Sequence, residues 1–126
     1  MRSSREAAGF DIYANKVSII QPETTVKIST GIILQIPKGY YVKLYDRSSM
    51  VMNQIFLQAG LIDSDYLGEL IVVLSNNRNE PFIIEKHMKI AQFIVHKLTD
   101  VEMCQCTEFE KETMRGTKGF GSTSFF

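Results

Sequence analysis

Short apolar segments separated by turn residues recur along the whole chain, and this pattern restricts the fold more than any other feature. Residues 25–29 alternate apolar and polar side chains with a period of two, and residues 70–74 form a continuous apolar run typical of a buried strand. Pro37-Lys38-Gly39 is a turn signature, because proline sets φ and glycine tolerates positive φ. Only residues 48–53 look like a single helical turn, and no segment keeps a helical apolar period for three turns. Further β-type segments are expected at residues 11–14, 16–20, 32–36, 40–45, 81–84 and 89–98. The pattern predicts an all-β sandwich or barrel.

Length and composition indicate one domain over residues 1–126, with a core of ordinary size. Residues 115–126 are rich in Gly, Ser and Thr, have no core pattern, and are expected to form a flexible C-terminal segment. Lys+Arg and Asp+Glu are both 14, so net charge points to neither a nucleic-acid nor a membrane partner. No apolar run approaches the roughly 18 residues of a membrane span, and no signal peptide opens the chain. A soluble, intracellular protein is expected.

Five clusters contain side chains that could take part in catalysis or ligand binding. They are Ala8-Gly9-Phe10-Asp11, Arg47-Ser48-Ser49, Gly60-Leu61-Ile62-Asp63-Ser64-Asp65-Tyr66, Lys89-Ile90-Ala91-Gln92 and Arg115-Gly116-Thr117-Lys118-Gly119-Phe120-Gly121-Ser122-Thr123. Each has a purely structural interpretation when it is taken alone. Asp11 fits a turn, Arg47-Ser48-Ser49 fits a serine-capped helix start, Tyr66 fits a core position, and Gln92 fits an outward-facing strand position. Asp63 and Asp65 fit loop carboxylates that bond their own backbone.

Together, the clusters contain what a nucleoside triphosphate site requires. Phosphates need closely approaching N–H and O–H donors and guanidinium groups, which Arg47 and Arg115 supply. Oxygen ligands such as Asp11 suit magnesium, which usually keeps several waters. An aromatic side chain such as Phe120 can cover a base, and a carboxylate such as Asp63 can orient an attacking water.

The order and spacing of the clusters resemble the five motifs of the trimeric dUTPase family, from Ala7 to Phe126. The segments at residues 60–66 and 119–123 are near-verbatim family motifs. The resemblance implies a distorted jelly-roll, or β-clip barrel, with at most one short helix and a mobile C-terminal tail. It also implies a Mg²⁺-dependent dUTP diphosphatase that forms dUMP and pyrophosphate, keeping uracil out of DNA and supplying dUMP for dTMP synthesis. The expected assembly is a homotrimer with active sites shared between subunits.

Residue roles follow from the same resemblance. Asp63 would orient the water that attacks the α-phosphorus, and Asp11 would help hold Mg²⁺ through its waters. Tyr66 would pack on the deoxyribose and leave no room for a 2′-hydroxyl, while the hairpin at residues 57–62, with Gly60 and Ile62, would read uracil. The residues expected to contact the phosphates are Arg47, Ser48, Ser49 and Gln92 from a neighbouring subunit, with Arg115, Gly121, Ser122 and Thr123 closing on the γ-phosphate and Phe120 stacking on uracil.

Several positions depart from the family pattern. Asp46 places a carboxylate beside the phosphate contacts, which is unfavourable unless it pairs with Arg47 or faces away. Lys89 replaces the usual arginine and keeps charge without the planar fork. Leu57 offers no side-chain amide to uracil, and only residues 1–6 precede the first motif.

Three rival functions remain open from the sequence. A dCTP deaminase shares the fold, but it needs a glutamate in the strand after the aspartate loop, and residues 70–74 hold no acid. A non-catalytic binding module would keep the fold without turnover. A zinc or redox protein would use Cys104 and Cys106, yet with His87 and His96 they show no recognised ligand spacing, and two free thiols are expected instead. The expected location is cytoplasmic or nuclear, and the compact length is compatible with a viral or transposon-encoded source.

Overall fold

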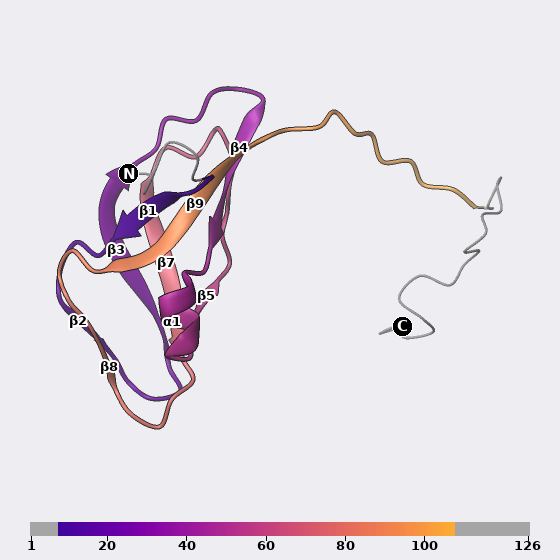
Figure 1. Cartoon of the computed structure of the whole chain (residues 1–126). Helices are drawn as coiled ribbons and strands as arrows, with labels where there is room; N and C mark the ends of the chain where they lie inside the picture. The colour runs from indigo at the N-terminus through magenta and orange to yellow at the C-terminus, as the bar shows by residue number, and fades with distance from the viewer. Residues whose placement is uncertain (1–7, 108–126) are drawn as a thin grey trace.

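The computed structural model describes residues 8–107, which form strands and one short helix (Figure 1). The elements are β1 (Phe10–Tyr13), β2 (Ser18–Ile20), β3 (Thr25–Ile33), β4 (Tyr40–Tyr45), α1 (Ser48–Met52), β5 (Ile55–Gln58), β6 (Leu61–Ile62), β7 (Glu69–Asn76), β8 (Phe82–Ile84) and β9 (Lys89–Lys97). The predicted all-β class with a single helical turn is therefore confirmed.

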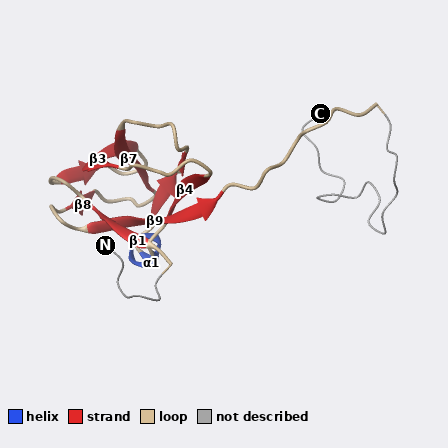
Figure 2. Ribbon diagram, turned by 90° about the horizontal axis from the view of Figure 1, so that it is seen from above, coloured by secondary structure: helices blue, strands red, loops and turns tan. Residues whose placement is uncertain are grey.

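The strands form three antiparallel sheets. A four-stranded sheet has the order β1-β9-β4-β6, a three-stranded sheet has the order β3-β7-β5, and β2 pairs with β8. Viewed from above, the sheets surround a common interior, with α1 at one side (Figure 2). Within the described residues the sheets do not close into one barrel.

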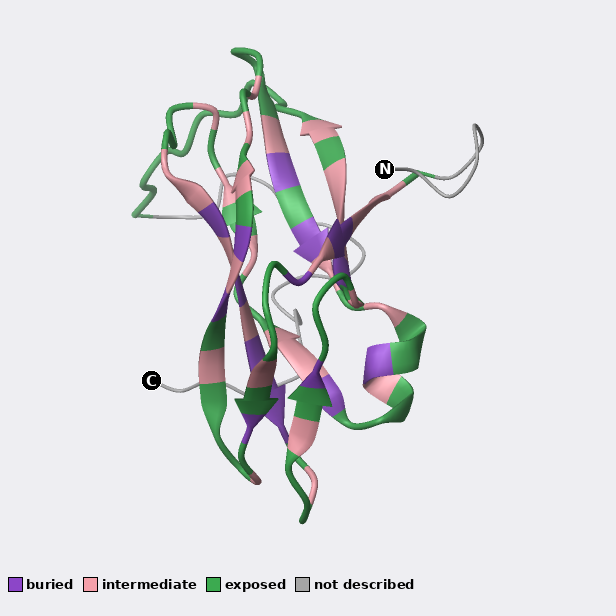
Figure 3. Cartoon of the chain, turned by 90° about the vertical axis from the view of Figure 1, so that its left-hand side faces the viewer, coloured by how far each residue is buried: buried purple, intermediate pink, exposed green. Residues whose placement is uncertain are grey.

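Buried residues from the strands and from α1 form one hydrophobic core. Along several strands, buried residues alternate with partly buried or exposed ones (Figure 3). In β7 the buried apolar side chains are Leu70, Val72 and Leu74, whereas Ile71 and Val73 between them are only half-buried. The continuous apolar run at residues 70–74 therefore belongs to a strand with two different faces, because successive side chains of a strand point to opposite sides.

Strand boundaries follow the predicted segments closely where turn residues punctuate them. The turn at Pro37-Lys38-Gly39 is present, with the Tyr40 N–H donating to the Pro37 carbonyl at 3.2 Å and Gly39 at φ 91°. Residues 25–29 and 32–36 were predicted as separate β-type segments, but β3 continues through Gly31 to Ile33, with a register shift against β7 between Ser29 and Ile33.

Beyond β9, residues 98–107 leave the sheets as an extended segment whose residues are all exposed (Figure 1). Cys104 and Cys106 lie on it as free, exposed thiols, as expected. Among residues 8–107, no helix has the length and apolar character needed to cross a membrane. Arg115, Phe120, Gly121, Ser122, Thr123 and the rest of the expected C-terminal closing segment lie outside the described residues.

Candidate functional site

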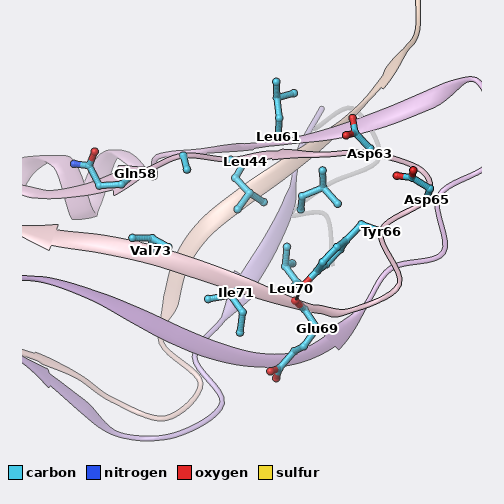
Figure 4. Close-up of a pocket in the computed structure, with 13 residues that line it drawn as sticks. Leu44, Gln58, Leu61, Asp63, Asp65, Tyr66, Glu69, Leu70, Ile71 and Val73 are labelled. Atoms are coloured by element: carbon cyan, nitrogen blue, oxygen red, sulfur yellow. Dashed lines mark hydrogen bonds between the residues drawn. The ribbon is translucent and has the colours of Figure 1, made fainter.

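A cavity of about 460 Å³ lies where β7 faces the end of β5, β6 and the turn that follows them (Figure 4). Its lining residues are Leu44, Gln58, Ala59, Gly60, Leu61, Ile62, Asp63, Asp65, Tyr66, Glu69, Leu70, Ile71 and Val73. The third sequence cluster therefore contributes Gly60, Ile62, Asp63 and Tyr66 to one cavity. Its mostly apolar walls with a few polar groups at the edge are typical of small-molecule sites.

The segment between β5 and β6 carries the chain from one sheet to the other. β5 pairs with β7 and β6 pairs with β4, so residues 57–62 do not form the hydrogen-bonded hairpin that the resemblance implied. Ala59 at φ 58° and Gly60 at φ 157° make the transition. The Gly60 carbonyl accepts from the Leu44 N–H at 2.8 Å, and a Cβ on Gly60 would lie 3.1 Å from Leu44 Cβ. A glycine is needed here because the backbone conformation is left-handed and the neighbouring strand is close.

The turn after β6 places Asp63 and Tyr66. The Tyr66 N–H donates to the Asp63 carbonyl at 3.1 Å, and the Tyr66 hydroxyl donates to the Glu69 carbonyl at 2.6 Å. In Figure 4 the Tyr66 ring extends toward Leu70 and Glu69, and the carboxylates of Asp63 and Asp65 lie at the outer end of the cavity. Tyr66 is 46% exposed, so its interpretation as a core residue was wrong.

The carboxylates of Asp63 and Asp65 accept no hydrogen bond from any residue between 8 and 107. Both side chains are exposed. The interpretation of these aspartates as loop carboxylates bonded to their own backbone is therefore not supported by the geometry. A carboxylate at a cavity rim with free acceptor oxygens can orient a water molecule.

A second polar group forms where β1, β9 and the end of β4 meet. Asp11 lies opposite Gln92 across β1 and β9, and Gln92 lies opposite Tyr45 across β9 and β4. Arg47 Nη1 donates to Asp11 Oδ1 at 2.7 Å, and Lys89 Nζ lies 3.6 Å from Asp11 Oδ2. We call Asp11, Arg47, Lys89 and Gln92 the basic cluster. None of its residues lines the cavity.

Arg47 keeps donor capacity beyond its ion pair. Its Nε is buried and has no hydrogen-bond partner among the described residues, while 27% of the side chain remains exposed. A buried donor without a partner is costly, and an arriving anion would satisfy it. Arg47 is therefore a candidate residue for binding an anion.

The predicted helix start at Arg47-Ser48-Ser49 is present, but serine does not cap it. Arg47 occupies the N-cap position, and no side chain makes a capping hydrogen bond. Ser48 and Ser49 are both exposed. Their hydroxyls are thus available to a ligand that also contacts Arg47.

Within the described residues Asp46 makes no ion pair with Arg47, and its carboxylate is bonded to β5 instead. Asp46 Oδ1 accepts from the Leu57 N–H at 2.7 Å, and the Asp46 carbonyl accepts from Gln92 Nε2 at 3.2 Å. A Cβ on Gly9 would lie 2.9 Å from Gln92 Oε1, so glycine in the first cluster lets the amide approach. Asp46 therefore connects the basic cluster to Leu57 of β5, which directly precedes the cavity residue Gln58.

Glu69 is a cavity residue that sequence reasoning missed. It is the first residue of β7, so the strand after the aspartate loop does carry an acid, contrary to the argument used against a deaminase. Glu69 Oε1 accepts from Ser29 Oγ and from the Gly31 N–H, each at 2.7 Å. These bonds, the one from Ser29 first, lower the pKa of Glu69 below its ordinary value of 4.5, with a smaller contribution from Lys16 opposing slight desolvation. The carboxylate points away from Asp63 and Asp65 (Figure 4) and is already bonded, which does not suit a proton shuttle.

Ile71 and Val73 were also missed as lining residues, whereas Gln58 belongs to the segment 57–62 that was expected to contact the base. Gln58 lies opposite Val73 across β5 and β7, and Ile71 is two residues earlier on the same face. The available signal was the period of two, which places Glu69, Ile71 and Val73 on one side of the strand.

Comparison with known proteins places this chain in a family. A sequence model described as dUTPase matches residues 1–124. The chain is 38% identical over 123 residues to the deoxyuridine 5′-triphosphate nucleotidohydrolase of Nautilia profundicola, covering 95% of this chain and 86% of that protein. It is also 38% identical to the protein of that name from Saccharomyces cerevisiae, covering 97% and 84%. The structure of the Staphylococcus bacteriophage 80alpha dUTPase with dUpNHpp superposes with a TM-score of 0.87 at 26% identity, covering 98% of this chain and 90% of that one. The chain therefore belongs to the dUTPase family.

Proposed function

We propose that this protein hydrolyses dUTP to dUMP and pyrophosphate in the cavity between β6 and β7. The observation that carries the proposal is the placement of Asp63 and Tyr66 on one largely apolar cavity in a chain of the dUTPase family. Such a reaction would keep uracil out of DNA and supply dUMP for dTMP synthesis.

The nucleoside occupies the cavity. The backbone of the segment that includes Gly60 and Ile62 reads the uracil edge, and Ile71 and Val73 form the apolar wall. Tyr66 packs on the deoxyribose and leaves no room for a 2′-hydroxyl. The discrimination between dUTP and UTP is therefore measured by the ratio of their kcat/KM values.

Asp63 orients a water for in-line attack on the α-phosphorus. Asp63 accepts a proton from this water as a bond forms between the water oxygen and the α-phosphorus. The bond from that phosphorus to the bridging oxygen breaks, and its electron pair leaves with pyrophosphate. The free, exposed carboxylate at the cavity rim supports this role. General-base assistance of this kind contributes about 10²–10⁴-fold to a rate.

The donor set fits a magnesium ion held chiefly by the triphosphate. Magnesium is commonly bound by one or two carboxylates plus substrate phosphates and keeps several waters. The described residues contain no group of three His, Cys, Asp or Glu side chains arranged for a metal, so Asp11 would act singly, through water. When bound, the ion neutralises charge on the phosphates.

The phosphates are bound by a neighbouring subunit of a homotrimer through Arg47, Ser48, Ser49 and Gln92. This arrangement is supported by the separation of the basic cluster from the cavity lining and by the unsatisfied Arg47 Nε. Arg115 with Gly121, Ser122 and Thr123 closes on the γ-phosphate, and Phe120 stacks on uracil. These last residues lie outside the described part of the chain, and their roles stay predictions.

Asp63→Asn tests the reaction directly, with Asp65→Asn as a control that changes an equally exposed carboxylate on the same cavity. With magnesium present, we expect Asp63→Asn to lose about 10²–10⁴-fold in kcat for pyrophosphate release from dUTP. It should still bind the non-hydrolysable analogue dUpNHpp with a Kd close to that of the unaltered protein. Normal turnover by Asp63→Asn would refute the assignment of the base.

A panel of dUTP, UTP, dTTP and dCTP, assayed with magnesium and with a chelator, tests the substrate. We expect release of pyrophosphate from dUTP alone, lost on chelation. Folded protein that binds dUpNHpp but leaves dUTP unhydrolysed would instead favour a non-catalytic binding module.

A further inference from the structure

Glu69 bonds to two separate parts of the structure through two different groups. Its side-chain Oε1 accepts from Ser29 Oγ and from the Gly31 N–H of β3, each at 2.7 Å. Its main-chain carbonyl accepts from the Tyr66 hydroxyl at 2.6 Å. One residue thus joins an irregularity in β3 to the aromatic wall of the cavity.

The irregularity in β3 explains why a carboxylate is needed there. The register shift between Ser29 and Ile33 and the positive φ of Gly31, 70°, interrupt the regular ladder with β7. An N–H released from a ladder needs another acceptor, and Glu69 supplies it to Gly31. The neighbouring Thr30 Oγ1 donates to the Leu70 carbonyl at 2.6 Å, so the irregular part of β3 is bonded to the first two residues of β7.

The position of the Glu69 main chain in turn determines where Tyr66 lies. A Cβ on Gly68 would lie 2.5 Å from the Tyr66 hydroxyl, so the side chain of Tyr66 passes directly over Gly68 to reach the Glu69 carbonyl. Tyr66 is 46% exposed, so its hydrogen bond to the Glu69 carbonyl contributes to holding the side chain in place. A shift of the start of β7 therefore moves the tyrosine.

We propose that Glu69 is a positioning residue that sets the place of Tyr66 against the sugar and so determines the preference for deoxyribose over ribose. The inference rests on the proposed function for the identity of the ligand. Glu69 acts through its bonds to β3 and does not contact the reacting atoms.

The variants separate the carboxylate's hydrogen bonds from its charge. Glu69→Gln keeps an acceptor oxygen at the same distance along the side chain, whereas Glu69→Met is unbranched and similar in length but accepts nothing. Gly68→Ala displaces the Tyr66 hydroxyl directly and leaves the Glu69 carboxylate intact. Glu85→Gln, at an exposed turn before β9, is the matched control.

We expect Glu69→Met to lower the ratio of kcat/KM for dUTP to that for UTP about tenfold, mainly through KM, while Glu69→Gln and Glu85→Gln stay within about twofold. Gly68→Ala should lower the ratio similarly. Because both substitutions act on Tyr66, the double variant Gly68→Ala/Glu69→Met should be no worse than the poorer single variant. Folded Glu69→Met with unchanged discrimination would overturn the proposal, as would additive effects in the double variant.

Hydrogen exchange tests the positioning without turnover. The Gly31 amide should exchange faster in Glu69→Met than in Glu85→Gln, and Kd values for dUMP and UMP should converge in Glu69→Met. An unchanged Gly31 exchange rate overturns the inference even if dUTP is hydrolysed, whereas failure of the unaltered protein to hydrolyse dUTP sinks the proposed function alone. If Glu69→Met does not fold, Ser29→Ala replaces it, because it removes one of the two donors to the Glu69 carboxylate. A ratio of kcat/KM for dUTP to that for UTP that is unchanged in Ser29→Ala would then overturn the proposal.

Discussion

Asp46 and Glu69 each use a carboxylate oxygen to satisfy a backbone N–H at the edge of the functional site. Asp46 bonds Leu57 in β5, and Glu69 bonds Gly31 in β3, with donor–acceptor distances of 2.7 Å in both cases. Neither role was foreseen, because a hydrogen bond between residues 11 or 38 positions apart leaves no periodic signal in the sequence. By contrast, Asp63 and Tyr66 could be grouped as candidate site residues from the sequence, because they occur in one short motif, and the structure places both on the cavity.

Substitution of Asp46 tests the first of these bonds. Asp46→Ala leaves the Leu57 N–H without its acceptor and is expected to lower the free energy of unfolding by about 1 kcal/mol, a small value because the bond is exposed. Asp46→Asn keeps an acceptor oxygen and serves as the control. Urea denaturation of both variants measures the difference, and equal midpoints would show that the bond contributes nothing.

The second bond predicts a dependence of stability on pH. The pKa of Glu69 in the folded protein lies below the ordinary value of 4.5, so the unfolded chain takes up a proton first as the pH falls. The contribution of the Glu69 carboxylate to the stability of the folded protein is therefore complete above pH 4.5. It is lost as the pH falls through the lower pKa of the folded protein. Glu69→Gln lacks this ionisation. Denaturant unfolding across pH should show the gap between the two proteins narrowing in acid, and a constant gap would contradict the assignment.

At the scale of elements, the sequence predicted best those strands that end in turn residues. β4 coincides with residues 40–45, and β9 begins at Lys89 as expected and ends one residue before the predicted 98. The prediction of two separate segments in place of β3 was wrong. The Gly31 N–H donates to Glu69, which is distant in the sequence, and the local pattern does not show this contact. β5 and β6 are too short to show a period, and their pairing with different sheets depends on tertiary contacts.

The crossing between β5 and β6 can be tested at Gly60. Gly60→Ala must place a Cβ 3.1 Å from Leu44 Cβ in a backbone conformation at φ 157°, and we expect a loss of about 1–3 kcal/mol in unfolding free energy. It should also raise KM for dUTP. Gly39→Ala is the matched control, since its φ is also positive, 91°, but no atom lies within 4 Å of the added Cβ. If both variants raise KM equally, the crossing does not shape the cavity.

At the scale of the whole molecule, the functional residues fall into two groups within one chain. Asp63 and Tyr66 lie on the cavity, and Arg47 lies with Asp11 in the basic cluster. Composition and periodicity cannot show that two groups belong to different halves of a shared site, because that depends on the arrangement of subunits. In the proposed homotrimer, the Arg47 of one subunit would lie at the cavity of the next.

Mixing two inactive proteins tests this arrangement. Asp63→Asn and Arg47→Ala are each expected to be nearly inactive alone. Trimers formed at random from equal amounts should recover about a quarter of the unaltered activity, because half of the cavities keep Asp63 and half of those receive an intact Arg47. Light scattering should give the mass of a trimer. An inactive mixture of confirmed mixed trimers would place both residues in the site of a single chain.

The two faces of β7 have different roles: one face packs in the hydrophobic core, and the other lines the cavity. Val72 and Leu74 fill the interior, Ile71 and Val73 face the cavity, and Leu70 is buried and also borders the cavity. Redesign of nucleobase preference can therefore enlarge or shrink alternate positions along one strand without opening a void beneath them. The same arrangement makes an insertion or deletion in β7 doubly damaging, because a slip of one residue would exchange the ligand wall with the interior.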